Sequence, residues 1–337
     1  MSDFDLVREL FPDRGADDGA RQRVRAAVAA HAVRRPRRLT RRRLVPAVGT
    51  IVAAAAAAIA TVALLGGTNA TVSASAARVL HQASRAARNE PSVATLAPGQ
   101  YLYTKSVDAY ESTTGGTRRD GTTWEYSVLL PTTREIWLDR NDTGWLHETG
   151  GEPVWLSEHD RQTWIAHGRP DLGGGPSDAR LAGAPGAAGQ MASLDLPSDP
   201  DALYATLKSE AEGNGNGTYQ EMFTLVGDAL RENYTTPAQR AALYDVAARL
   251  PGIELAGRTV DGAGRPALAV GMENGHDQAR SVLLFDPTSY ALLGEQTTAL
   301  AGNSGGYPVG TVVGQATYLE QRIVDQVPAS VVRAAKH

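Results

Sequence analysis

The residues best suited to acid, base or metal chemistry are scattered along this 337-residue chain. No pair of histidines has the HExxH spacing or another close ligand spacing of a metal site. His159, Asp160 and His167 come nearest to a ligand set, but solvated loop side chains explain them better. The sequence therefore predicts no metal and no cofactor. The seven histidines are His31, His81, His147, His159, His167, His276 and His337.

One glycine-rich segment resembles a protease motif. Residues 302–306 read GNSGG, similar to the GDSGG around the serine of trypsin-like proteases, but Asn303 stands where that motif has Asp. The chain contains no cysteine and no S-x-x-K motif. We interpret 302–306 as a loop. The expectation is a non-enzymatic protein, with an envelope hydrolase as the remote alternative.

Clustered aromatic residues indicate a different chemistry, the binding of an apolar ligand. All five tryptophans fall within residues 124–164, and Tyr101, Tyr103 and Tyr126 lie in or shortly before that stretch. Side chains at alternate positions of a strand share one face of a sheet, and such a face can form an apolar groove. Ordinary strand packing is the alternative interpretation. The candidate groove residues are Tyr101, Tyr103, Trp124, Tyr126, Trp137 and Trp145.

Strands are expected to carry these aromatic residues. A period of two runs through 100–109, 122–130, 134–140 and 143–149, with Gly, Asp-Gly and Pro in the gaps. Residues 168–190 are rich in Gly, Pro and Ala and predict a loop. A second group of strands is predicted at 253–260, 265–272, 280–285, 290–299 and 311–324.

Three helices are predicted between the two groups of strands. They cover about 200–208, 218–233 and 236–251, and capping boxes are expected at Thr218 with Glu221 and at Thr236 with Gln239. A lone half sheet would expose an apolar face, so both groups should join in one α+β domain over 99–326. The expected architecture is a curved antiparallel sheet, an open half-barrel, packed on about three helices.

Residues 44–65 form the one segment that is expected to cross a membrane. They contain 22 residues without a charge. At 1.5 Å per residue such a helix spans roughly 33 Å, against a hydrocarbon core of about 30 Å. A buried, Ala-rich soluble helix is the alternative. Seven arginines directly precede the span and none directly follows it: Arg34, Arg35, Arg37, Arg38, Arg41, Arg42 and Arg43.

This arginine run predicts the topology. The positive-inside rule places residues 1–43 in the cytoplasm and the rest of the chain outside. Residues 1–43 hold 12 arginines and six carboxylates, whereas residues 66–337 hold 21 basic and 31 acidic residues. A nucleic-acid patch is the competing interpretation of the run, but no aromatic residues interleave with it. Anionic lipid headgroups fit better, and no nucleic-acid partner is expected.

A cleaved signal peptide is the main alternative to an anchor. Small residues allow cleavage after Ala74 or Ala76, but the basic region would then be about 43 residues long, far above the usual length. We therefore predict a signal-anchor, followed by a juxtamembrane helix and linker at 66–98. Residues 327–337 are predicted to be a C-terminal tail.

The cytoplasmic tail is too short to form a core. Apolar residues recur at helical spacing in residues 1–33, which predicts either a disordered or membrane-surface tail or a peptide that docks on a cytoplasmic partner.

Several short segments carry a resemblance that covers nearly the whole chain: DLVREL at 5–10, PGQYLY at 98–103, LPSDP at 196–200, AQRAALY at 238–244, LPG at 250–252, DGAGR at 261–265 and FDPT at 285–288. The chain resembles an uncharacterised family of actinobacterial single-pass membrane proteins that are often encoded beside extracytoplasmic-function sigma factors. That family has no established activity, so no catalytic residue is implied.

The order of strands, helices and strands is also similar to the half-barrel of lipoprotein carriers and of periplasmic sensors that partner anti-sigma factors. In those folds a curved sheet wraps a helical plug and can hold acyl chains. The resemblance implies a membrane-tethered binding or sensing protein that regulates a sigma factor through residues 1–33. The alternative is an envelope module for a lipid or another apolar ligand. Unlike zinc-type anti-sigma domains, the tail has no cysteine.

Overall fold

The structure is a computed structural model that describes residues 73–90, 96–118, 120–141, 143–182, 196–213, 217–231 and 235–335. The predicted membrane span, the arginine run and the tail 1–33 lie outside the described residues. Among the residues that are described, no helix combines the length and the apolar character needed to cross a bilayer.

One large antiparallel sheet organises the domain. Nine strands follow one another in the order β6-β4-β3-β1-β11-β10-β9-β8-β7, and β2 and β5 extend the sheet beside the far half of β1. The bounds are β1 Tyr101–Thr117, β2 Thr123–Leu129, β3 Thr132–Leu138, β4 Thr143–Gly150, β5 Val154–Trp155, β6 Ser177–Ala182, β7 Glu254–Val260, β8 Pro266–Asn274, β9 Ala279–Phe285, β10 Leu292–Ala299 and β11 Val312–Val324.

The predicted union of the two strand groups is confirmed. β1 pairs with β11 from Tyr101 opposite Val324 to Tyr110 opposite Gly314, so the first and last strands of the domain lie side by side. The α+β class and the antiparallel sheet packed on helices are therefore as expected. Six helices are described: α3 Ala74–Ala87, α4 Glu158–Ala166, α5 Pro200–Ala211, α6 Thr218–Leu230, α7 Pro237–Ala247 and α8 Ala329–Ala334.

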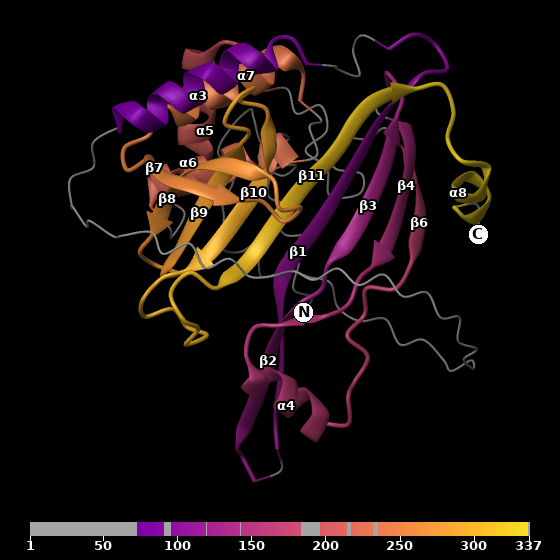
Figure 1. Ribbon diagram of the computed structural model, residues 1–337, viewed down its shortest axis with the longest axis vertical. Coiled ribbons are helices and arrows are strands. Elements are labelled where there is room, and N and C mark those ends of the chain that lie inside the picture. The colour runs from indigo at the N-terminus through magenta and orange to yellow at the C-terminus, as the bar shows by residue number, and fades with distance from the viewer. Residues whose placement is uncertain are drawn as a thin grey trace, which may run out of the picture.

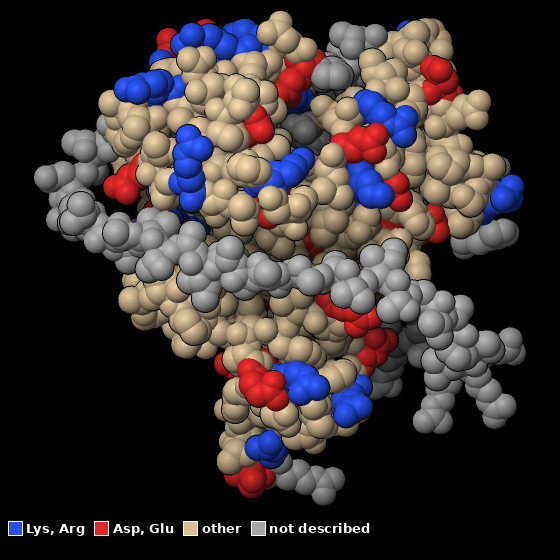
Figure 2. All heavy atoms as spheres, viewed as in Figure 1, with Lys and Arg blue, Asp and Glu red and all other residues tan. Residues whose placement is uncertain are grey.

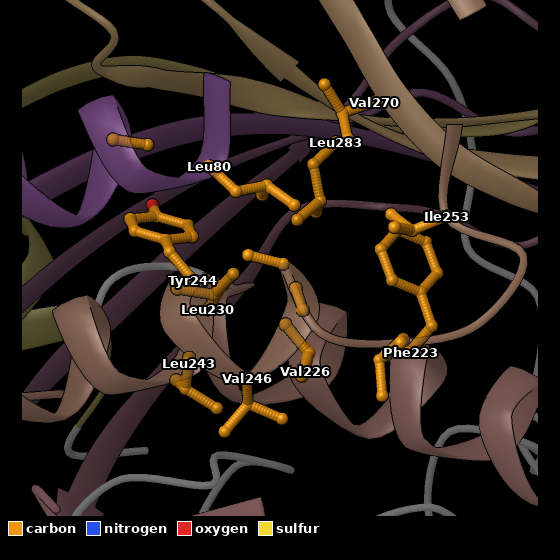
Figure 3. Close-up of a cluster of buried hydrophobic side chains, with 14 of the residues drawn as sticks. Leu80, Phe223, Val226, Leu230, Leu243, Tyr244, Val246, Ile253, Val270 and Leu283 are labelled. Atoms are coloured by element: carbon orange, nitrogen blue, oxygen red, sulfur yellow. The ribbon is translucent and has the colours of Figure 1, made fainter. Parts of the chain in front are cut away.

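The helices are unevenly distributed over the sheet. Figure 1 shows α3, α5, α6 and α7 gathered at the β7–β10 end, with α8 beyond β6 at the opposite edge and β2 with α4 projecting below. The main core lies under the four gathered helices, where side chains of α3, α6 and α7 meet Val270 of β8 and Leu283 of β9 (Figure 3).

Helix α3 belongs to this core. Ser73 caps it by accepting a hydrogen bond from the Ala76 N–H, and Ala76 and Leu80 are fully buried. Tyr244 of α7 belongs to the same cluster as Leu80, and Figure 3 shows the two side by side. Residues 74–87, which the sequence assigns to a juxtamembrane segment outside the domain, therefore pack as part of it.

Local sequence signals predict most helix starts, with one error. Thr236 and Gln239 form the expected capping box at α7. At α6, however, the N-cap is Gly217 and no side-chain cap is present, so the box predicted at Thr218 is wrong. Thr218 already lies inside the helix, where its hydroxyl is one position too late to accept from the first turn.

The predicted loop at 168–190 also needs correction, because β6 forms within it. This strand is six residues long and pairs only with β4, at an edge of the sheet. A short edge strand carries little periodic signal. Helices α4 and α8 are short as well, and neither was among the predicted elements.

Candidate ligand site on the helix-facing side of the sheet

One side of the sheet faces the four gathered helices, and the strand register shows which residues lie on it. Asp108 of β1 is directly opposite Ala316 of β11, and Ala316 is in turn opposite Glu295 of β10. Glu295 is opposite Leu283 of β9, which belongs to the helix-packed core. Directly opposed residues of antiparallel strands point to the same side of a sheet. Asp108 and the residues at alternate positions of β1, such as Ser106 and Tyr110, therefore point to the side of the sheet that the helices cover.

The far half of this side carries an apolar group made by strands alone. In the described part of the chain the group comprises strand residues of β3, β4 and β6, and each of the four is at most 5% exposed. Ile136 is directly opposite both Thr104 of β1 and Leu146, which places the group on the helix-facing side. The members of this β3–β4–β6 apolar group are Ile136, Leu138, Leu146 and Leu181, with Ala179 packed against them.

A row of polar side chains runs beside the apolar group, and we call it the interior polar row: Ser106, Asp108, Arg134 and Glu148. Arg134 of β3 is directly opposite Ser106 of β1 on one side and Glu148 of β4 on the other. Arg134 Nη1 donates to Glu148 Oε1 at 2.8 Å, and Arg134 Nε lies 3.7 Å from Asp108 Oδ2. One largely buried guanidinium thus lies between two carboxylates.

Two polar atoms on this side have no hydrogen-bond partner among the described residues. Ser106 is 1% exposed and its Oγ is unpaired, and the buried Nε2 of Gln321 is unpaired as well. Gln321 is opposite Thr104 on the adjoining strand, next to the Ser106 position. Buried polar atoms in folded proteins are usually paired with protein, water or ligand. These two atoms therefore mark positions where a bound molecule can supply partners.

The polar row continues into a second charged cluster, which we call the α6 junction: Tyr110, Asp228, Arg231 and Glu295. Tyr110 donates its hydroxyl hydrogen to Glu295 Oε1 at 2.5 Å. Arg231 Nη2 lies 2.7 Å from the same oxygen and 3.0 Å from Asp228 Oδ1. Because Arg231 follows the last turn of α6, the junction ties that helix end to β1 and β10.

Burial controls the protonation of the α6 junction. It raises the pKa of Tyr110 well above its ordinary range, and the Glu295 carboxylate adds to the shift. Burial lowers the pKa of Arg231, but Glu295, Tyr110 and Asp228 outweigh it and raise the pKa overall. Burial also raises the pKa of Asp228 to about 6, against the pull of Arg231. A neutral phenol, a permanent cation and a titrating carboxyl therefore share one site.

Replacing Asp228 with Asn is expected to stabilise the protein above pH 6. The raised pKa means that the folded state favours the protonated acid, so this group's stabilising contribution is complete below about pH 4 and is lost as the pH rises through 6. Two pKa units correspond to at most about 3 kcal/mol. Thermal unfolding of the wild-type protein and the Asp228→Asn variant between pH 4 and 8 measures the difference in their stability. This difference should vanish near pH 4. Destabilisation by D228N at pH 8 would contradict it.

The structure divides the six candidate aromatic residues into two groups. Four lie together on β1, β3 and β4, on the side of the sheet away from the apolar group. Tyr103 and Trp137 have ring centroids 5.2 Å apart, and Tyr101 meets Trp145 edge-on at 6.0 Å. Val331 of α8 packs on this cluster. These four side chains thus secure α8 to the sheet.

The other two candidate residues lie in the projecting β2–α4 lobe. Trp124 stacks on Tyr126 at 6.0 Å and on His167 at 3.9 Å, and Tyr126 meets Trp155. Pro131 lies between β2 and β3, and β2 pairs with residues 111–117 of β1, away from the main sheet. The six residues therefore do not line one common surface.

The histidine and glycine motifs have structural roles. Asp160 accepts hydrogen bonds from the Ser127 N–H at 2.9 Å and from the Ser157 hydroxyl at 2.5 Å, which fixes α4 on β2. Among the described residues no group of three metal-ligating side chains occurs. Residues 302–306 form turns between β10 and β11, as the loop interpretation predicts.

Sequence reasoning missed the interior polar row and the α6 junction. A local signal does exist on β1, where Thr104, Ser106, Asp108 and Tyr110 occupy alternate positions and so share one polar side. Their partners on β3, β4, α6 and β10 are separated from these β1 residues by roughly 20 to 190 positions in the sequence. Only the strand register brings them together.

No protein-family model and no curated protein matches this chain. Among solved structures, MucB in complex with MucA(peri) aligns at 12% identity and a TM-score of 0.24, over 76% of this chain and 60% of that chain. A putative outer membrane lipoprotein-sorting protein domain from Vibrio parahaemolyticus aligns at 10% identity and a TM-score of 0.22, over 76% of this chain and 96% of that one. This chain thus spans about 60% of the MucB chain.

Proposed function

We propose that this chain is a non-enzymatic, membrane-tethered, extracytoplasmic protein that binds an amphipathic ligand on the helix-facing side of its sheet. The observation that carries the proposal is the unpaired, buried Ser106 Oγ beside the β3–β4–β6 apolar group. A ligand with an apolar part and a polar end would match both surfaces. On this proposal residues 1–33 face the cytoplasm, where they are available to a sigma factor, and binding outside regulates that contact.

The two surfaces supply complementary energies. Each CH₂ group of a ligand that leaves water is worth about 0.8 kcal/mol, so packing an acyl chain or a similar group against these four residues can hold it. The interior polar row then selects the polar end. Ser106 and Gln321 can hydrogen-bond it, and Asp108 with Glu148 outnumber the one cation, Arg134, which favours a hydroxyl or an amine over an anion.

The place of α3 supports an anchor that stays attached. Cleavage after Ala76 would remove a fully buried residue and the capping Ser73 from the mature domain. Loss of an N-cap alone typically costs about 1 kcal/mol. A chain that keeps residues 44–73 keeps both the tether and the first turn of α3.

Replacing Leu146 with Phe is expected to reduce ligand binding and to leave the ligand-free protein nearly as stable. The larger ring would occupy the space over the apolar group that the ligand needs. The probe is a pyrene-labelled long-chain alcohol, whose hydroxyl end matches the interior polar row, added to the delipidated full chain in detergent. We expect at least tenfold weaker binding, and a change in the free energy of unfolding below about 1 kcal/mol.

Leu243→Phe is the matched control, because Leu243 is fully buried in the helix-packed core. There the extra volume should cost about 1–3 kcal/mol and leave probe binding unchanged. If Leu146→Phe destabilises as much as Leu243→Phe and probe binding persists, the space is already filled and the proposed ligand site is wrong.

A further inference from the structure

The solvent-facing side of α3 carries only positive charge. Arg78, His81, Arg85 and Arg88 are exposed and follow one another at intervals of three or four residues, so they form one stripe. Residues 74–87 contain no Asp or Glu. Figure 2 shows Lys and Arg side chains gathered along the part of the surface that α3 occupies in Figure 1.

The stripe is only partly neutralised by the protein. Asp245 of α7 lies 3.0 Å from His81 Nδ1 and 3.6 Å from Arg88 Nη2. Within the described residues, no ion pair is formed by Arg78 or Arg85. The opposite side of the helix is buried in the core, so the stripe cannot turn away from solvent. Two exposed cations are thus held in a fixed direction by the fold.

The stripe also lies close to the expected membrane. Ser73 follows the predicted span by eight residues, which reach at most about 28 Å when fully extended. Beyond the span the chain holds 31 acidic and 21 basic residues, so an anionic membrane repels the domain as a whole. A cationic stripe next to the attachment point reverses that repulsion on one side only.

We propose that the α3 stripe lies against anionic phospholipid headgroups and sets the orientation of the domain on the membrane. The partner is a lipid surface, recognised by charge alone. This proposal rests on the tether of the proposed function, and it adds the side of the domain that meets the membrane. Each arginine near an anionic surface contributes about fivefold to the docking equilibrium, so Arg78 and Arg85 together contribute about 25-fold.

The test uses the full chain in vesicles. The sequence has no cysteine, so Asn89→Cys places a single spin label at the end of the stripe, and Thr114→Cys places one on the distant β1–β2 hairpin. A nickel-chelating lipid reports which label approaches the headgroups. With phosphatidylglycerol present we expect strong relaxation at position 89 and little at 114. Phosphatidylcholine alone, or about 1 M salt, where the Debye length is about 3 Å, should abolish it.

Charge removal supplies the decisive comparison. Arg78→Gln with Arg85→Gln should lower the docked fraction at position 89 severalfold. Arg140→Gln with Arg333→Gln removes the same charge from exposed positions elsewhere and should change nothing. Equal relaxation in neutral and anionic vesicles, or no effect of the α3 pair, would overturn the proposal.

Alkaline extraction of the same vesicles separates this result from failure of the tether. A chain that remains in the membrane but shows no docking at position 89 overturns the orientation proposal alone. A chain that is extracted contradicts the anchor, and with it both proposals.

Discussion

Replacing Glu295 with Gln is expected to lower the free energy of unfolding by about 3 kcal/mol. Glu295 accepts from both Tyr110 and Arg231, and its side chain is only 14% exposed. Removing one partner from a buried ion pair leaves an uncompensated charge, which typically costs 3–5 kcal/mol. Here that charge would be Arg231, with only Asp228 left beside it. Chemical denaturation of the full chain in detergent measures the loss.

Glu273→Gln is the control for this prediction. Glu273 makes the same kind of ion pair, with Arg280 on the neighbouring strand, but its side chain is 48% exposed. Exposed ion pairs contribute about 0–1 kcal/mol to stability, so Glu273→Gln should hardly change the free energy of unfolding. Adding Arg231→Met to Glu295→Gln should recover part of the loss, because the stranded charge is then absent. Equal effects of the two glutamate variants would show that the α6 junction is not a buried network.

Leu80→Ala is expected to destabilise the whole domain by about 2–5 kcal/mol. Leu80 is fully buried among side chains of α3, α7 and the sheet, and truncating such a residue leaves a cavity. The magnitude decides whether α3 is part of the cooperative unit. For a domain of this size each kcal/mol shifts the midpoint of thermal unfolding by about 2–4 °C.

Arg78→Ala serves as the comparison on the same helix, since Arg78 is exposed and has no carboxylate partner among the described residues. Surface changes of this kind stay within about 0.5 kcal/mol. If Leu80→Ala were as mild as Arg78→Ala, α3 would be a linker helix that packs without contributing to the stability of the domain.

The α6 junction and the helix-packed core connect the candidate site to α3. The α6 junction holds the end of α6 beside the interior polar row, and α6, α7 and α3 share one core. A ligand that recruits Asp108 or Glu148 acts next to groups that fix α6. Helix α7 packs against both α6 and α3, and α3 is the helix that follows the predicted span.

Local patterns determined much of this protein. Alternation in residues such as 100–109 and 280–285 predicted the strands, because successive side chains of a strand point to opposite sides of the sheet. Turn and capping residues predicted three helices, and the charge asymmetry around 44–65 predicts a topology that the described residues do not reach. The order of these elements was enough to expect one antiparallel sheet.

The tertiary structure alone decided which residues share a site. Pairing of β1 with β11 joins the two halves of the sheet, and the register then sets Ser106 beside Arg134 and Glu295 within reach of Tyr110. Periodicity shows that alternate side chains share a side, but not which side the helices cover or which strands are neighbours. For that reason the aromatic residues, conspicuous in the sequence, separate into two packing clusters. The inconspicuous alternation of Thr104, Ser106, Asp108 and Tyr110 builds the candidate site.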